Sequence, residues 1–249
     1  MSLDIKIGSY SFTDYIDTFE ISQDSRLEQV TIPRRDGFLS DVAYKSGMSI
    51  RIGGVITCQD YNTTRSVLNS IKNALGNGLV VFTLFSDRQV SCQKTYFMSS
   101  HEEVDMRRIR WEAQLACDDF GFVDVDPTAS ERTISESPQT EAFVNNGNLE
   151  TRPIIRITAG GDNIASGLRI DNTSTGKYCV INMVITAGNW IEIDSDLLTV
   201  VDQAAASKLA YFSGDFLKLA AGSNSIVWTG TAASSPLLKM TYRGKYDGA

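Results

Sequence analysis

Residues 144–161, VNNGNLETRPIIRITAGG, join a cluster of turn-forming residues to a strand-like run. Asparagine and glycine fill residues 145–148 and favour a tight turn, because both tolerate backbone conformations that most residues avoid. The run led by Pro153 alternates isoleucine with polar residues, which is typical of a strand with one buried face. We therefore expect residues 145–148 to begin a second domain.

The segment before this turn predicts a linker. Residues 123–142 read VDVDPTASERTISESPQTEA, which is rich in Ser, Thr, Glu and Pro and has no apolar period. Such a segment buries little apolar surface and is expected to be open to proteases over residues 126–141. The sequence thus predicts a first domain over residues 1–130, a linker over 131–144 and a second domain over 145–249.

Composition sets the class of protein. The chain has 249 residues, of which 42% are hydrophobic and 21% charged, as in a soluble globular protein of one or two domains. No apolar run approaches the roughly 20 residues that span a bilayer, and no signal peptide is evident, so no membrane insertion is expected. The net charge of −7 argues against a general nucleic-acid binder, although a ring that lets DNA pass unheld would tolerate it.

Strands of period two dominate the first domain. The clearest is residues 107–117, RRIRWEAQLAC, whose apolar residues fall on one face and whose charged residues fall on the other. Residues 78–98 predict two strands around a turn near Ser86–Arg88. Residues 48–57 predict another strand, in which the pair Gly53–Gly54 indicates either a bulge or a close backbone approach.

Two segments of the first domain depart from this pattern. Residues 59–78, QDYNTTRSVLNSIKNALGNG, carry apolar residues at helical spacing, with Asp60 as the predicted N-cap and Gly76 or Gly78 as the stop. Residues 34–47, RRDGFLSDVAYKSG, are charged, small and glycine-containing. They predict a long loop or the tip of an extended hairpin.

The second domain is predicted to be a β-sandwich. Residues 177–194, 215–230 and 236–246 alternate apolar and polar side chains and are separated by Gly/Asn turns at about ten-residue spacing. The expected fold class is therefore mainly β. The first domain is expected to be a β-sandwich with one helix and a long hairpin or loop, and the second domain a further β-sandwich.

The sequence offers little for catalysis. The one histidine, His101, lies in an acidic, turn-like stretch, and no metal-binding motif includes it. Asp118, Asp119, Asp124 and Asp126 lack the spacing of a calcium loop and are expected at an exposed strand end. The four cysteines have no Cys-x-x-Cys spacing and are expected to be reduced and structural, with a disulfide or a reactive thiol as the alternative. We expect no catalytic residue, no metal and no cofactor.

Aromatic residues of the second domain are the candidates for a binding surface. Trp190, Tyr211, Trp228 and Tyr242 could stack on sugar rings, as aromatic faces do in carbohydrate-binding sandwiches. The alternative is that they pack in the core or along strand edges.

The chain resembles the distal tail proteins of long-tailed (siphovirus-type) bacteriophages over nearly its whole length. In the first domain the resemblance rests on residues 32–57, 63–75 and 80–93. In the second it rests on the order and spacing of NNGNLETRPIIRI (145–157), LRIDNTSTGKYCVINMVI (168–185), WIEIDSDLLTV (190–200), SGDFLKLAAGSNSIVWTG (213–230) and LKMTYRGKY (238–246).

The resemblance implies a tail-tube-like first domain that forms a homohexameric ring at the tail tip, and a galectin-like or carbohydrate-binding-module-like second domain. Such a ring joins the tail tube protein to the tail-hub protein, with a receptor-binding protein as a further partner, and DNA passes through its lumen. It is part of the virion, made in the host cytoplasm. By position, Arg34, Arg35, Asp36 and Gly37 match a loop that makes subunit contacts.

Two other functions stay open at this point. One is a carbohydrate-binding adhesin that recognises host-surface glycans through the second domain. The other is a glycan hydrolase, whose two carboxylates could meet from distant strands. The sequence selects no such pair of carboxylates.

Overall fold

The computed structural model describes residues 4–26, 29–31, 38–40, 44–101, 107–119, 121–231 and 234–247. It divides into two compact units, Met1–Val125 with Asp247–Ala249, and Asp126–Tyr246. Each unit has its own hydrophobic core. The division comes after Val125, earlier than the predicted start of the second domain at residue 145.

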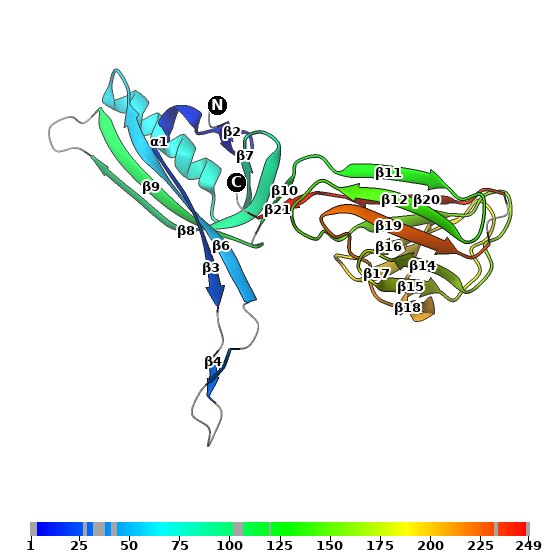
Figure 1. Cartoon of the computed structure of the whole chain (residues 1–249). Coiled ribbons are helices and arrows are strands. Elements are labelled where there is room, and N and C mark those ends of the chain that lie inside the picture. The colour runs from blue at the N-terminus through cyan, green and yellow to red at the C-terminus, as the bar shows by residue number, and fades with distance from the viewer. Residues whose placement is uncertain are drawn as a thin grey trace. The chain divides into compact units, whose positions relative to one another are not determined.

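The first unit contains one helix and ten strands in its described part. They are β1 (Ile5–Ile7), β2 (Tyr10–Ser11), the 3-10 turn η1 (Thr13–Tyr15), β3 (Thr18–Arg26), β4 (Gln29–Thr31), β5 (Phe38–Ser40), β6 (Tyr44–Thr57), α1 (Tyr61–Leu75), β7 (Leu79–Leu84), β8 (Arg88–His101), β9 (Arg108–Cys117) and β10 (Phe122–Asp124). The main sheet has the order β2-β1-β7-β8-β9-β6-β3, and β10 also pairs with β8 (Figure 1).

The main sheet curls, so that strands far apart in its order share one core. The ring of Phe19 on β3 stacks on that of Phe82 on β7, with the ring centroids 6.1 Å apart. On β9, Ile109, Trp111, Ala113, Leu115 and Cys117 are all buried, which confirms the predicted apolar face. The turn between β7 and β8 is also as predicted, with positive φ angles at Phe85 and Ser86.

Helix α1 covers one face of the main sheet, and its capping matches the prediction. The Asp60 carboxylate accepts hydrogen bonds from the Thr63 backbone N–H at 2.9 Å and from the Thr63 hydroxyl at 2.7 Å. These contacts lower the pKa of the Asp60 carboxyl. Gly76 ends the helix with a positive φ of 51°. The buried side chains Leu68, Ile71 and Leu75 recur at helical spacing and pack into the core.

The segment after β3 is a hairpin, the second of the two predicted alternatives. Strands β3 and β6 remain paired as far as Arg26 and Tyr44, and β4 then pairs with β5 (Figure 1). The pair Gly53–Gly54 in β6 is expected to mark either a bulge or a close backbone approach, and the structure shows a close approach of the Tyr15 backbone to Gly54. The register of β6 is regular there on both sides, and a Cβ on Gly54 would meet the Tyr15 carbonyl oxygen at 1.9 Å.

The second unit is a sandwich of two five-stranded sheets. Its elements are β11 (Thr128–Thr133), β12 (Gln139–Asn145), β13 (Ile154–Thr158), β14 (Leu168–Asn172), β15 (Lys177–Ile181), β16 (Trp190–Asp194), β17 (Thr199–Asp202), η2 (Leu209–Tyr211), β18 (Phe212–Gly214), β19 (Gly222–Thr229), β20 (Leu237–Tyr242) and β21 (Lys245–Tyr246). One sheet has the order β11-β20-β13-β16-β17 and the other β12-β19-β14-β15-β18, and the two share one core. The predicted β-sandwich is confirmed.

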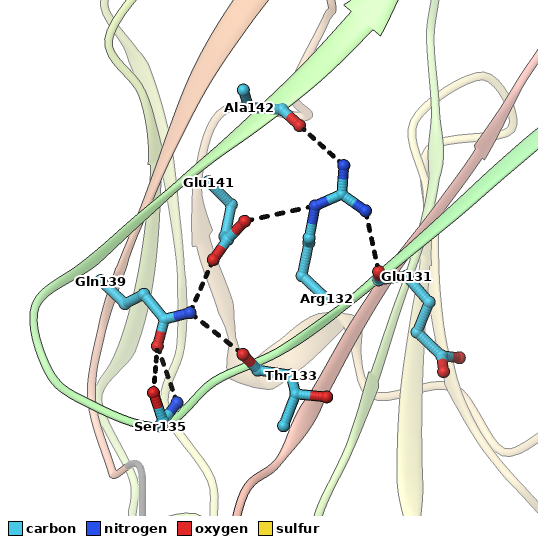
Figure 2. Close-up of polar contacts among 7 residues, drawn as sticks. All are labelled: Glu131, Arg132, Thr133, Ser135, Gln139, Glu141 and Ala142. Atoms are coloured by element: carbon cyan, nitrogen blue, oxygen red, sulfur yellow. Dashed lines mark hydrogen bonds and ion pairs between the residues drawn. The ribbon is translucent and has the colours of Figure 1, made fainter.

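The predicted linker over residues 131–144 is wrong. This segment supplies most of β11 and β12, which form an edge strand of each sheet. Gln139 holds the turn between them: its side-chain oxygen accepts the Ser135 N–H at 2.7 Å, and its amide donates to the Thr133 carbonyl at 3.0 Å (Figure 2). Polar edge strands and the turn between them can therefore have the composition of a linker. Because these strands are hydrogen-bonded into the sheets, we no longer expect selective proteolysis at residues 126–141.

Side chains also cover the free edge of β12. Arg132 on β11 donates to the Ala142 carbonyl at 3.2 Å and forms an ion pair with Glu141 at 3.2 Å (Figure 2). The hydroxyl of Tyr242 on β20 donates to the Val144 carbonyl at 2.7 Å. These contacts satisfy backbone acceptors that an edge strand would otherwise expose.

The turn at residues 145–148 lies inside the second unit, after β12, and does not begin it. Asn145 is buried and fixes the turn: its amide donates to the Leu149 carbonyl at 2.8 Å, and its oxygen accepts the Gly147 N–H at 3.0 Å. Two further buried asparagines, Asn172 and Asn224, are hydrogen-bonded to each other at 3.1 Å. The Asn/Gly positions in the sequence are thus loop-fixing residues of the sandwich.

Candidate functional site

Four strands of the first unit form a sheet with two unpaired edges. Strands β3, β6, β9 and β8 are successive antiparallel neighbours. In the described part of the chain, β3 pairs with β6 only. Strand β7 pairs with β8 only as far as Gln93, so residues 94–101 of β8 have β9 alone as a partner. Both edges therefore present backbone N–H and C=O groups that another strand could pair with.

The direction of these strands decides how copies could pair. Because three successive antiparallel pairings connect β3 to β8, these two strands run in opposite directions. A rotation about an axis along the strands would place β3 of one copy against β8 of the next in antiparallel orientation. The two edges can therefore pair head to tail, and no edge would be left free in an assembly whose rotation closes.

Apolar side chains lie along both edges. On β8, Tyr96 and Met98 are 45% and 46% exposed. Phe97 is half-buried on the helix-facing side, where the Lys72 ammonium lies 5.4 Å from the centre of its ring. On β3, Phe19 and Ile21 are also half-buried against the core. A second strand laid along either edge would cover more of these side chains, which favours pairing.

The face of this four-stranded sheet opposite α1 carries charges of both signs. Register places Tyr96, Gln114, Arg51 and Glu20 in one row across the four strands. The Arg51 guanidinium lies 2.7 Å from a Glu112 oxygen and 3.6 Å from a Glu20 oxygen. The hydrogen bond from Arg51 lowers the pKa of Glu112, so this carboxylate stays ionised at neutral pH.

A hollow of about 300 Å³ lies on the same face, over Gly53 and Gly54. Met98, Arg110 and the Arg51–Glu112 pair line it. It is open and its main charges are already paired with each other, so its geometry does not define a ligand site. The face as a whole is mixed in charge.

The predicted subunit-contact residues Arg34, Arg35, Asp36 and Gly37 lie outside the described residues, between β4 and β5 in the sequence. The structure thus describes the paired strands on either side of this segment and leaves the contact role as a prediction.

The four candidate glycan-stacking aromatics do not form one surface. Trp228 and Tyr242 are buried, at 0% and 5% exposure, and belong to the core. Trp190 lies on β16 in one sheet, and its ring is covered by the Arg156 guanidinium at 4.3 Å. Tyr211 lies on η2, beside the other sheet. The alternative interpretation as packing residues therefore holds for Trp228 and Tyr242.

The described residues contain no assembled metal centre. Among them, no group of three His, Cys, Asp or Glu side chains is placed to bind a metal ion. His101 is exposed at the end of β8, with its ring 5.9 Å from that of Tyr61. Within the same residues, no helix is long and apolar enough to cross a membrane.

Sequence reasoning missed the two sheet edges, because strand order is a long-range property. One signal was available. Residues 96–98, Tyr-Phe-Met, break the apolar–polar alternation of β8 with three consecutive apolar side chains. Such a run places apolar side chains on both faces of the strand, which is typical of a strand with little face left to solvent.

The first unit is a β-domain with two open strand edges, and the second unit is a β-sandwich. Residues 146–246 match the family of the siphovirus-type tail component, C-terminal domain. The match lies within the second unit, and together with the fold of the whole chain it supports a structural component of a siphovirus-type phage tail.

A solved structure shares the fold of the whole chain. The chain is similar to the crystal structure of Dit (gp 19.1) of phage SPP1, described as a paradigm of the hub adsorption apparatus in phages that infect Gram-positive bacteria. The TM-score is 0.73 at 12% identity, over 98% of this chain and 99% of that one. A chain of the activated phage P2 baseplate with Ca gives a TM-score of 0.46 at 8% identity, over 97% and 98%. No curated protein sequence matches.

Proposed function

We propose that this chain forms a closed ring at the tip of a phage tail, joining the tail tube to the tail hub. The observation that carries the proposal is the pair of unpaired, oppositely directed edges on β3 and β8. The similar fold of SPP1 Dit, itself described as part of a hub adsorption apparatus, supports the same role. The role is structural and non-enzymatic.

The family resemblance implies six subunits, and the strand geometry is compatible with that number. Six copies of the four-stranded sheet would close a barrel of about 24 strands. At a strand spacing of about 4.8 Å and a tilt of about 40°, its diameter between backbones is about 48 Å. After side chains are subtracted, this lumen still admits a DNA duplex. We therefore propose a homohexamer whose lumen is lined by the mixed charges of Arg51, Glu112 and Glu20.

The family resemblance implies the partners of such a ring. A ring has two ends, and we propose the tail tube protein at one and the tail-hub protein at the other, with a receptor-binding protein as a further partner of the second unit. The alternative, a glycan-binding adhesin, has less support. Trp190 lies on β16 in one sheet and Tyr211 on η2 beside the other sheet, while Trp228 and Tyr242 are buried.

The subunit-contact segment provides the first test. We expect the double substitution Arg34→Glu and Arg35→Glu to shift the protein from ring towards monomer, because it replaces cations suited to carboxylate partners across a seam. Mass photometry over a concentration series measures the shift, and far-UV circular dichroism checks the fold.

A matched control is available. Arg65→Glu with Arg152→Glu changes the net charge equally, on exposed residues of α1 and of the second unit. It should leave the ring fraction at the wild-type value. Equal loss of rings in both double variants would mean that overall charge, and not the segment at residues 34–37, controls assembly.

A further inference from the structure

Two cysteines of the first unit lie directly opposite each other on neighbouring strands. Cys92 on β8 and Cys117 on β9 are register partners. Both belong to the core, at 0% and 8% exposure, and both are free thiols. Cys58 and Cys179 have no cysteine partner in the strand register. The first unit thus contains one cysteine pair that the proposed ring function does not use.

The hydrogen-bond pattern fixes the geometry of this pair. The Asp118 N–H donates to the Ser91 carbonyl at 2.9 Å, so residues 91 and 118 form a hydrogen-bonded pair of the antiparallel ladder. The next pair, Cys92 and Cys117, is therefore a non-hydrogen-bonded pair. In such pairs the Cα atoms are about 4.5 Å apart and the side chains are at their closest. That spacing lies inside the Cα–Cα range of disulfides, about 4.4–6.8 Å.

We propose that Cys92 and Cys117 form a redox-convertible pair, a dithiol when the protein is made in a reducing compartment and a cross-strand disulfide once a small-molecule disulfide oxidises it. The bond would tie β8 to β9 immediately before residues 94–101, the part of β8 that presents an open edge. Oxidation therefore fixes the base of this edge without changing its exposed side chains.

The reaction balances as two thiol–disulfide exchanges. The Cys117 thiolate attacks one sulfur of oxidised glutathione, which gives a mixed disulfide and releases one glutathione thiolate. The Cys92 thiolate then attacks the Cys117 sulfur and releases the second glutathione. The two cysteine protons pass to the two glutathione thiolates. Overall the cysteine pair loses two electrons and oxidised glutathione gains them.

The surroundings make the first exchange slow. Cys117, at the end of β9, keeps some exposure, whereas Cys92 has none, so reaction starts at Cys117. A hydrogen bond with Cys92, burial and the nearby charge of Asp118 raise the pKa of the Cys117 thiol above its ordinary range. Because the thiolate is the nucleophile, the dithiol persists in a reducing compartment and oxidation needs prolonged exposure.

The test uses the full chain, folded, incubated with oxidised glutathione and then alkylated without reduction. We expect free thiols to fall from four to two and a linked pair of tryptic peptides to appear, residues 89–94 with 111–132. The thermal midpoint of the first unit should rise by about 5–10 °C, since the bond closes a loop over residues 93–116.

Controls separate this pair from general oxidation. Cys58→Ser and Cys179→Ser should each still form the linked peptides, whereas Cys92→Ser and Cys117→Ser should not. The peptide map of the wild type decides the matter even if the last two variants fold poorly. Four free thiols at the end of the oxidation, a glutathione adduct that never closes, or bonds to Cys58 or Cys179 would overturn the proposal.

Discussion

Replacing Gly54 with alanine is expected to unfold the first unit, or to lower its thermal midpoint by at least roughly 10 °C, equivalent to about 3 kcal/mol. A Cβ at this position would lie 1.9 Å from the Tyr15 carbonyl oxygen and 2.8 Å from its carbonyl carbon. Both are backbone atoms, so no side-chain rotation relieves the clash. Gly54 is also in register with Trp111, whose indole N–H donates to the same Tyr15 carbonyl at 3.2 Å.

The matched control is Gly78→Ala. A Cβ on Gly78 meets no atom within 4 Å, so its effect should stay within about 1 kcal/mol. Hydrogen exchange followed by mass spectrometry locates the damage. We expect peptides of β6 and β9 to lose protection in Gly54→Ala while peptides of the second unit keep it. Wild-type protection in both units would show that the close approach of η1 to β6 is wrong.

Replacing Trp228 with alanine is expected to destabilise the second unit by about 3–5 kcal/mol, because it removes a large side chain from a closed core. Trp228 is 0% exposed, lies on β19 and is among the largest fully buried side chains. Its neighbours in that core come from both sheets, so the cavity cannot collapse without moving the sheets. Thermal unfolding and exchange in residues 126–246 provide the measurement.

Trp190→Ala is the comparison, because Trp190 is half-exposed and contacts Arg156 across its ring. We expect it to cost about 1 kcal/mol or less. Any loss of glycan binding in Trp228→Ala would therefore report unfolding and not the loss of a stacking surface. A Trp228→Ala protein as stable as Trp190→Ala would contradict the placement of Trp228 in the core.

Local signals in the sequence predicted the local structure well. Helix α1 follows from apolar spacing, the Asp60 cap and Gly76, and the buried face of β9 follows from strict alternation. Both depend on residues close together in the chain, and periodicity reports such structure directly. The Gly53–Gly54 pair left two interpretations open, because a close approach depends on where Tyr15 lies.

Long-range structure could not be predicted in the same way. Strands β11 and β12 are edge strands, so only a few of their side chains are buried and their composition resembles that of a linker. Trp228 and Trp190 are both strand tryptophans, and only the packing of two sheets places one in the core and the other at the surface. The open edges of β3 and β8 depend on strand order, which no local pattern contains.

The most direct measurement is electron cryo-microscopy of the purified full-length chain at high concentration. We predict closed six-membered rings in which β3 of one subunit is hydrogen-bonded, antiparallel, to residues 94–101 of β8 in the next. A strict monomer at high concentration, together with no ring of this chain in images of assembled tails, would contradict the account. So would a ring in which both strand edges remain unpaired.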